Sequence, residues 1–515
     1  MNSATPILLI ALPWLYPFAL GPSPSVFPWL VTLAATASLL LVAVIDSKVR
    51  VIGQEEKFAQ HWARHFTRAW LCAGISSSMM AQLQYFGVAM AFEPWINQTL
   101  AGEAFANLRQ RNQFATLTNI SLAALLWLSA RTQQMQTDAK ARRLGWLLVA
   151  ASLLAVGNAM SSSRTGLFQL LLLCGVYAVW GGLRGTRVRS LLLTAVLVYA
   201  VAMFAMPWAA GLDLATHGAF ARLGNDEACS SRLVLWSNVL HLIAEKPWLG
   251  WGWGELDYAH FITLYNEPRF CDILDNAHNL PLHLAVELGL PLALLVCGGF
   301  AWWVLRQKPW AERDPTRQMA WAVLAVILLH SMLEYPLWYG PFQMAFGMCV
   351  ILLLCHQKRP FKVENAPKKV LNRTLALVLN VRAATFLMAF ILLLLTTYAA
   401  WDYDRISQIY LQPEARDAQY RNNTLNKIRS SWLFADQVRF AELMVTPLGQ
   451  TNATWTFNTA NAMLHYSPEP RVIEKLIESA VMLGRDDEAL AYLARYRAAF
   501  PKEHALWAKA NAKLN

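Results

Sequence analysis

The sequence predicts an all-α polytopic membrane protein, and three observations lead to this fold class. Of its 515 residues, 56% are hydrophobic and only 15% are charged, whereas about 25% are charged in an ordinary soluble domain. The mean hydropathy is +0.31. Apolar windows of roughly 17 to 25 residues, long enough to cross a bilayer, recur along the chain as far as residue 400.

We expect about eleven transmembrane helices. They are predicted near 6–20, 26–45, 66–92, 113–130, 146–163, 167–182, 190–210, 280–305, 319–337, 341–356 and 374–400. The first is expected to remain uncleaved, because no Lys or Arg precedes it as in a signal peptide.

Lysine and arginine concentrate in alternate connections, which the positive-inside rule assigns to the cytoplasm. These connections are 46–61, 131–145, 183–189, 306–318 and 356–373. The N-terminus is then predicted to lie inside, and the segments 93–112, 211–279 and 401–515 outside.

Two domains follow from this pattern: a transmembrane domain over 1–400, with the large periplasmic loop 211–279, and a periplasmic α-helical domain over 401–515. The end of the chain shows two amphipathic patterns separated at Gly484, with a stop at Pro501, as in a tetratricopeptide-like hairpin. Such a hairpin needs further helices from 405–465 to cover its apolar face. The module either binds a protein or acts as a lid, or it only packs on the membrane domain.

Several classes of site are excluded. The net charge is +11, but the basic residues are scattered between apolar runs and not gathered on one domain, so nucleic acid is not expected as a partner. No Walker loop, HExxH or CxxC pattern occurs. We therefore predict neither a metal site nor a cofactor.

Two of the seven cysteines differ from the others because they fall in the large outside loop. An oxidising periplasm allows Cys229 and Cys271 to form a disulfide. Closing a loop of about 43 residues would reduce the entropy of the unfolded chain and so stabilise the fold by about 4 kcal/mol. The alternative is two unpaired thiols.

Three polar motifs at the outside ends of helices are candidates for chemistry. Arg164 lies in SSSRTG, Arg232 in SSRLVLWSNVL and His278 in DNAHNLPLHLAVELG. A guanidinium presents a fixed fork of donors that suits phosphate oxygens, and an imidazole can accept a proton near neutral pH. Each residue also has a plain structural interpretation, since arginines snorkel to headgroups and a histidine can hydrogen-bond at a helix start.

Other polar residues carry open alternatives. In HSMLEYPLWYGPF, His330 and Glu334 are spaced i,i+4, which fits either a buried structural pair or an active role for Glu334 or Tyr339. Gln82 and Gln84 are expected to hold helices together.

These motifs, in their order along the chain, resemble the O-antigen ligase and polymerase superfamily. LEYPLWY and the helical C-terminal part resemble its protein-glycosylating branch, the PglL-type bacterial O-linked oligosaccharyltransferases, and FANLRQRNQFATL at 105–117 is similar to the outside segment of that branch. The family more usually has a glycine near the start of this segment, so either Gln110 or Gln113 fills its glutamine position.

The resemblance implies transfer of a glycan from an undecaprenyl-diphosphate carrier to a hydroxyl of a periplasmic acceptor protein such as a type IV pilin, without metal or nucleotide. His278 would be the base, and Arg164 and Arg232 would hold the diphosphate. The remaining site residues would contact the sugar or phosphate or wall the site: Gln110, Asn112, Gln113, Tyr335 and Tyr339. Membrane lipids are the other expected partners.

Two further functions are compatible with the sequence. One is an O-antigen ligase acting on lipid A core, or a glycan polymerase. The C-terminal helical module favours a protein acceptor over these, since a lipid acceptor already lies in the membrane. The other is a transporter of the lipid-linked glycan, which should show internal repeats and charges at the bilayer midplane; the candidate charges are on one side.

Overall fold

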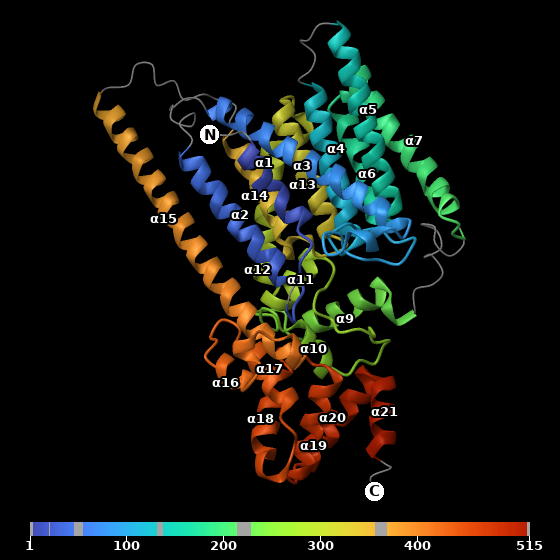
Figure 1. The fold of residues 1–515 in the computed structure, drawn as a ribbon, viewed down its shortest axis with the longest axis vertical. Helices are drawn as coiled ribbons and strands as arrows, with labels where there is room; N and C mark the ends of the chain where they lie inside the picture. The colour runs from blue at the N-terminus through green and yellow to red at the C-terminus, as the bar shows by residue number, and fades with distance from the viewer. Residues whose placement is uncertain are drawn as a thin grey trace. The chain divides into compact units, whose positions relative to one another are not determined.

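The computed structural model describes residues 4–19, 21–45, 55–130, 137–213, 228–355 and 368–511. Within these ranges every regular element is a helix (Figure 1). The predicted basic connections 46–61, 131–145 and 356–373, and the first part of the loop 211–279, lie partly outside the described residues.

The helices of the first 400 residues overlap the predicted apolar segments. They are α1 (Ala4–Leu15), α2 (Val26–Ile45), α3 (Glu55–Tyr85), α4 (Arg111–Ala130), α5 (Thr137–Met160), α6 (Arg164–Val179), α7 (Thr186–Ala209), α9 (Arg232–Glu245), α10 (Leu256–Ile262), α11 (Leu280–Leu288), α12 (Leu290–Gln307), α13 (Pro315–Ser331), α14 (Gly340–Cys355) and α15 (Lys368–Ser407).

Shorter helices form the C-terminal part. They are α16 (Thr424–Ile428), α17 (Ala435–Val445), α18 (Ala453–Met463), α19 (Pro470–Met482), α20 (Asp486–Ala499) and α21 (Pro501–Asn511).

The apolar helices fit a helical membrane protein. Among the described residues, five segments are long and apolar enough to cross a bilayer: Val26–Ile45, Arg111–Ala130, Thr186–Ala209, Leu290–Ala311 and Asn380–Tyr410. Four shorter apolar segments are Ala4–Leu15, Leu144–Met160, Arg164–Val179 and Gly340–Cys355. The count of eleven spans stays a prediction.

Two predicted spans have different bounds in the structure. The window 280–305 is divided at Gly289, whose φ of +81° ends α11 before α12 begins. The window 66–92 ends early, because α3 stops at Tyr85 and Gly87 takes a φ of +73°. Glycine adopts such left-handed conformations without the steric cost that other residues pay, and hydropathy alone does not register the change.

The chain forms two compact units. Unit 1 comprises Met1–Ala19, Ser23–Gly224 and Val304–Ala400, and unit 2 comprises Leu20–Pro22, Asn225–Trp303 and Trp401–Asn515. The units share the division between residues 400 and 401 with the predicted domains, but they group the large loop with the C-terminal helices.

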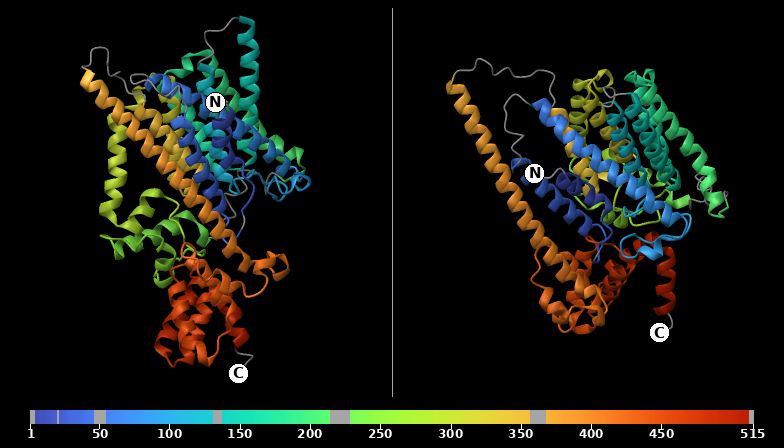
Figure 2. Two further views of the ribbon diagram at one scale, coloured as in Figure 1. Left: turned by 60° about the vertical axis from the view of Figure 1, so that its left-hand side comes forward. Right: turned by 45° about the horizontal axis from the view of Figure 1, so that its top comes forward.

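In unit 1, α4 is the central helix. It packs against α3, α5, α6, α7 and α13, and 89% of its apolar window is buried. Polar side chains tie it to its neighbours: Ser121 Oγ donates to the carbonyl of Trp70 at 2.6 Å, and Asn119 Nδ2 donates to the carbonyl of Gly166 at 3.1 Å. Interhelical bonds of this kind hold transmembrane bundles together. The helices around α4 can be followed from two further sides in Figure 2.

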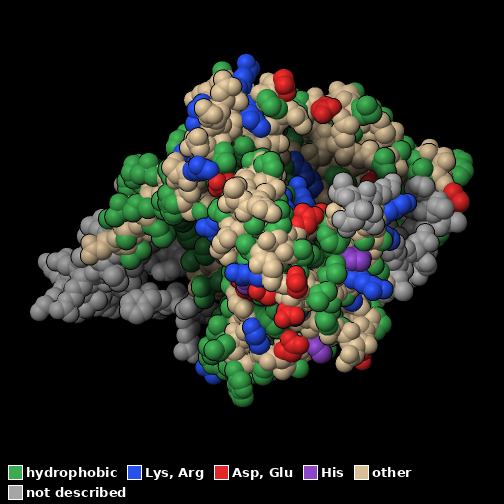
Figure 3. All heavy atoms as spheres, turned by 90° about the horizontal axis from the view of Figure 1, so that it is seen from below, with side chains coloured by type: hydrophobic (Ala, Val, Ile, Leu, Met, Phe, Trp, Pro, Cys, Tyr) green, Lys and Arg blue, Asp and Glu red, His purple; other side chains and the backbone are tan. Residues whose placement is uncertain are grey.

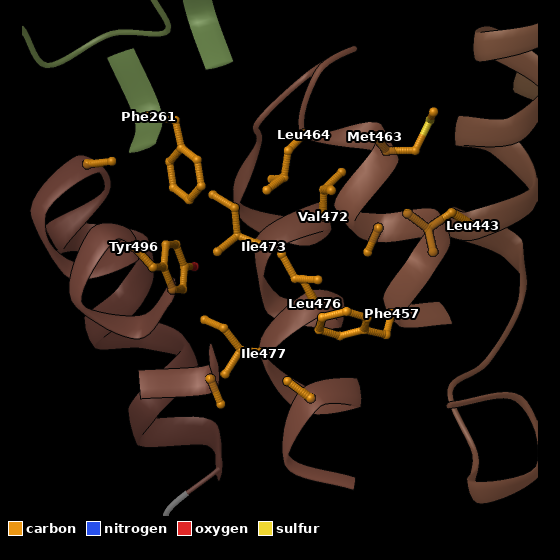
Figure 4. Close-up of a cluster of buried hydrophobic side chains, with 14 of the residues drawn as sticks. Phe261, Leu443, Phe457, Met463, Leu464, Val472, Ile473, Leu476, Ile477 and Tyr496 are labelled. Atoms are coloured by element: carbon orange, nitrogen blue, oxygen red, sulfur yellow. The ribbon is translucent and has the colours of Figure 1, made fainter. Parts of the chain in front are cut away.

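In unit 2, the large loop and the C-terminal helices share a hydrophobic core. Figure 4 shows Phe261, which is on α10, pointing toward Ile473 and Tyr496. Two polar contacts join the same parts: Arg495 Nε donates to the carbonyl of Ile262 at 2.8 Å, and His465 lies 2.6 Å from Glu255. The loop that carries Arg232 and His278 is therefore packed as one body with the C-terminal helices.

The surface of the C-terminal helices is mixed in character. On the face that Figure 3 shows, acidic and basic side chains are interspersed with hydrophobic ones. This mixture is typical of a domain that is in water, in contrast with the apolar helices of unit 1.

Candidate functional site

The candidate residues share one structural feature, because each motif lies at the first turn of a helix. The Gln110 carbonyl accepts the first bond of α4, from the Phe114 N–H at 3.1 Å. Arg164 is the first residue of α6 and Arg232 the first residue of α9, while His278 precedes the cap of α11. Helix N-termini present backbone N–H groups and the positive end of the helix dipole, which favour anions.

Backbone strain concentrates at the same motifs. Among the described residues, six non-glycine residues have positive φ, and four lie in the candidate segments: Ala106, Arg109, Ser162 and His278, with φ of +53°, +60°, +51° and +50°. Such residues cost of order 1–3 kcal/mol each and persist only where the surroundings fix them. Strain of this kind clusters at functional sites.

The outside segment before α4 is held by two buried amides. Gln84 Nε2 donates to the carbonyls of Asn97 and Ala106 at 2.7 and 2.8 Å, and its Oε1 accepts from the Ala106 N–H at 2.7 Å. Asn107 Nδ2 donates to the carbonyls of Leu15 and Trp95 at 2.8 and 2.9 Å. Gln84 thus binds the backbone of the segment that leads into Gln110. The sequence predicted only that Gln84 would hold helices together.

The start of α6 is connected to the start of α4. Ser163 caps α6 by accepting a bond from the Gly166 N–H at 3.0 Å. Its hydroxyl donates in turn to Asn112 Oδ1 at 2.6 Å. Arg164, the next residue, is exposed, so its guanidinium extends from a turn whose backbone is fixed from both sides.

A buried carboxylate completes this network. Glu334, which is 6% exposed, follows the end of α13. Asn112 Nδ2 donates to its Oε1 at 3.2 Å, and Gln110 Nε2 donates to its Oε2 at 3.4 Å. Unit 1 therefore brings Gln110, Asn112 and the cap before Arg164 together around Glu334.

Gln113 and the two tyrosines lie in the same unit. Gln113 is 2% exposed and its Nε2 has no hydrogen-bond partner among the described residues. Tyr335 and Tyr339 stack, with ring centroids 5.9 Å apart and planes at 20°. Tyr335 directly follows Glu334 in sequence, and Tyr339 follows the short helix Pro336–Trp338.

The second group of candidates is in unit 2. Ser231 caps α9 and places Arg232 in its first turn. Trp236, one turn later, donates from Nε1 to the carbonyl of Ala277 at 3.1 Å. Since Ala277 directly precedes His278, this bond ties the helix of Arg232 to the turn of His278.

The turn of His278 is defined by two asparagines. The His278 N–H donates to Asn276 Oδ1 at 2.9 Å, and Asn279 Oδ1 accepts from the Leu282 N–H at 3.2 Å as the cap of α11. Asparagine side chains stabilise such turns by replacing backbone acceptors. The imidazole is only partly buried, so it is held by the backbone and still accessible.

Two carboxyl groups of the same unit have raised pKa values. Burial raises the pKa of Asp257 to about 7; a bond from the Tyr258 N–H lowers it, and the charges of Glu255 and Asp275 raise it further. Desolvation also raises the pKa of Asp275, and His278 opposes that shift. The two acids therefore hold protons more readily than ordinary aspartates, and the charge of one of them, Asp275, interacts with His278.

The WLGWGWG segment at 248–254 is hydrogen-bonded to the end of α11, and we call this contact the lock. The Trp251 and Gly252 N–H groups donate to the carbonyls of Val286 and Glu287 at 2.9 and 3.0 Å. A Cβ on Gly289 would lie 2.2 Å from the Trp248 carbonyl oxygen, so only glycine permits this approach. Trp248 and Trp253 remain exposed, at 75% and 63%.

Substitution of Gly289 tests this lock. We expect Gly289→Ala to destabilise unit 2 by about 2 kcal/mol or more, because it adds a backbone clash to the cost of positive φ. The apparent Tm in detergent measures the effect. Gly254→Ala is the matched control: Gly254 has a φ of +78° but nothing within 4 Å of its added Cβ. Equal losses in both variants would contradict the lock.

The structure pairs Cys229 with Cys271 in a disulfide that closes a sequence separation of 42 residues. Phe270, beside Cys271, donates its N–H to Asn238 Oδ1 on α9 at 2.8 Å. The bridge therefore joins the chain before α9 to the segment around Phe270, which α9 already binds through Asn238.

We expect Cys229→Ser/Cys271→Ser to lower stability by about 4 kcal/mol, as the loop-closure entropy indicates. Dithiothreitol should shift the apparent Tm of the wild type downward and leave that of the double variant unchanged. A wild-type Tm that does not respond to reductant, with no bridged peptide in a non-reducing digest, would show two free thiols.

Two other features lie apart from the candidates. A cavity of about 440 Å³ between α6, α12 and α13 is lined by apolar residues such as Gly175, Trp180 and Leu324. In the part of the chain that is described, no group of three or more His, Cys, Asp or Glu side chains is placed to hold a metal ion.

Sequence reasoning did not find the groups that support the candidates. Ser163, Asn107 and Trp236 are not among the site residues predicted from the sequence. The cap pattern SSR, which occurs before both α6 and α9, is a signal that could have placed Arg164 and Arg232 at helix starts. The contacts of Asn107 and Trp236 are tertiary and leave no local signal.

Models of three protein families match the chain. "Protein glycosylation ligase" matches residues 104–128, "O-Antigen ligase" matches 147–297, and "Virulence factor membrane-bound polymerase, C-terminal" matches 318–515. Every candidate residue lies inside one of these segments. The resemblance to PglL-type O-oligosaccharyltransferases of the O-antigen ligase superfamily is confirmed.

Two curated relatives come from Acinetobacter baylyi. A general O-oligosaccharyltransferase is 23% identical over 285 residues, covering 54% of this chain and 48% of the relative. A ComP-specific O-oligosaccharyltransferase is 23% identical over 272 residues, covering 53% of this chain and 48% of the relative. The chain thus spans about half the length of the curated relatives that it matches.

Proposed function

We propose that this chain is an O-oligosaccharyltransferase of the bacterial inner membrane. It transfers a glycan from an undecaprenyl-diphosphate carrier to a Ser or Thr hydroxyl of a periplasmic protein, for which a type IV pilin is the leading candidate. The observation that supports this most is the set of helix starts. Helices α6 and α9 begin with Arg164 and Arg232, and His278, at a strained φ, directly precedes the cap of α11. The start of α4 carries Gln110 and Asn112. The names of the two relatives agree with the reaction class.

The proposed reaction is a single displacement at the anomeric carbon of the glycan. His278 accepts the proton of the acceptor hydroxyl, and the hydroxyl oxygen forms a bond to the anomeric carbon as the bond from that carbon to the diphosphate oxygen breaks. Arg164 and Arg232 stabilise the negative charge on the departing undecaprenyl diphosphate. The diphosphate is a good leaving group, so orientation and charge neutralisation provide most of the catalysis.

The second candidate is transfer to lipid A core or to another glycan, which the family names "O-Antigen ligase" and "membrane-bound polymerase" favour. The C-terminal helices favour the protein acceptor, because they share a core with the loop that carries the proposed base, and a lipid acceptor would not need such a module outside the membrane. We also propose that these C-terminal helices form tetratricopeptide-like hairpins.

The two candidates separate in one experiment. The purified protein in lipid vesicles receives a lipid-linked glycan together with either a pilin-like protein or lipopolysaccharide core. Mass spectrometry of both acceptors reads the transfer. A glycan-sized mass increase on a serine or threonine of the protein supports the oligosaccharyltransferase, whereas modification of the core alone would replace it with a ligase.

A further inference from the structure

We propose that Glu334 is a positioning residue that fixes the direction of the hydrogen bonds at the start of α4, so that Gln110 presents an acceptor, not a donor, to the glycan. This inference deepens the proposed function and rests on it. It assigns Gln110 to a hydroxyl or amide N–H of the sugar and not to a phosphate oxygen, a choice that the sequence leaves open.

The direction follows from the chemistry of a carboxylate. The proposal takes Glu334 as ionised, and an ionised carboxylate only accepts hydrogen bonds. The amides of Gln110 and Asn112 accordingly turn their nitrogens toward it, at 3.4 and 3.2 Å. The assignment of amide oxygen and nitrogen, which is otherwise ambiguous at such side chains, is settled here by the partner.

The direction of the hydrogen bonds at Glu334 also determines the direction of those at the start of α6. Because Asn112 Nδ2 faces Glu334, Asn112 Oδ1 faces Ser163 and must accept the hydroxyl proton, at 2.6 Å. The Ser163 oxygen is left to accept the Gly166 N–H at 3.0 Å, which is the bond that caps α6 before Arg164. Both ends of the Asn112 amide are therefore hydrogen-bonded, the nitrogen to Glu334 and the oxygen to Ser163.

Gln110 is different, because only one side of its amide is used. Its Oε1 is buried and has no hydrogen-bond partner among the described residues. A buried acceptor without a donor is rare in native proteins and marks a place for a ligand or water. A group that donates a hydrogen bond, such as a sugar hydroxyl or an acetamido N–H, satisfies it, and a phosphate oxygen does not.

Exchange of donor and acceptor provides the test. In Glu334→Gln, the new carboxamide accepts from one amide but offers a donor to the other. Either Gln110 turns over and loses its free acceptor, or Asn112 does and disturbs the cap. In Glu334→Gln/Gln110→Glu, the carboxamide accepts from Asn112 and donates to the carboxylate at position 110, whose second oxygen is again an acceptor. The net charge is unchanged.

We expect Glu334→Gln to raise the KM for the lipid-linked glycan by about 10- to 100-fold, the cost of one mispaired buried group, with the acceptor KM unchanged. The double variant should recover at least tenfold of this loss. Glu312→Gln is the control, since Glu312 is also buried near an end of α13 but pairs with Arg317 at 2.7 Å; it should change stability and not the KM per folded molecule.

Three results would overturn the proposal: a wild-type KM in Glu334→Gln, a double variant no better than the single one, or a rise in the acceptor KM alone. Thermal unfolding of the wild type, Glu334→Gln, Gln110→Glu and the double variant gives a readout that does not need activity. The proposal predicts that each single variant loses stability and that the double variant recovers it. If this is found but the wild type transfers no glycan, the paired amides are supported and only the proposed function fails. Additive losses reject the pairing.

Discussion

We expect His278→Ala to lower kcat/KM for glycan transfer by about 10²- to 10⁴-fold, the usual contribution of a positioned general base. The structure gives this histidine a backbone of positive φ, fixed by Asn276 and by the bond from Trp236 to the preceding carbonyl. Removing the imidazole leaves those backbone contacts in place. The substitution should therefore lower the rate of transfer and not the stability of the fold.

Transfer rates of the purified variant in vesicles, with its apparent Tm, measure this effect. His241→Ala is the matched control: His241 is in the same unit, on α9, exposed at 48%, and pairs with Glu245 at 3.2 Å. If His278→Ala retains a wild-type rate while its Tm drops, the histidine is structural and the base lies elsewhere.

The arginines should show the next largest effect. We expect Arg164→Gln and Arg232→Gln each to lower kcat by about 10²- to 10³-fold, comparable to the loss of one group that stabilises developing charge. Lysine at either position should recover only part of the rate, because it restores the charge without the bidentate fork.

The control for the arginines is Arg439→Gln, an exposed arginine of α17 that pairs with Asp436 at 3.3 Å. Its rate should equal that of the wild type. Full activity in Arg232→Gln or Arg164→Gln would mean that the residue only lies at a helix start and interacts with lipid headgroups.

The helices that carry the candidates were predictable because their signals are local. Ser163 and Ser231 directly precede Arg164 and Arg232, and serine is a preferred helix cap. Apolar runs located most helices of unit 1. The same hydropathy signal passed over the break at Gly289, because leucines continue on both sides of it and the left-handed glycine changes direction without changing polarity.

The contacts that organise the candidates could not be predicted from the sequence. Glu334 lies 222 residues from Asn112 in the chain, and an i,i+4 spacing suggested a partnership with His330 instead. In the structure His330 Nδ1 lies 2.9 Å from the Thr116 hydroxyl, while Glu334 binds the amides at the start of α4. The grouping of the large loop with the C-terminal helices likewise depends on Phe261, one apolar residue among many in the sequence.

The intact mass of an acceptor pilin tests the central claim most directly. The wild type and His278→Ala are each co-expressed with a lipid-linked glycan pathway and the pilin, at equal levels in the membrane. The account predicts a glycan-sized mass increase with the wild type and none with the variant. Unmodified pilin in both, with glycan attached to lipid A core, would contradict the protein acceptor, and equal modification in both would contradict His278 as the base.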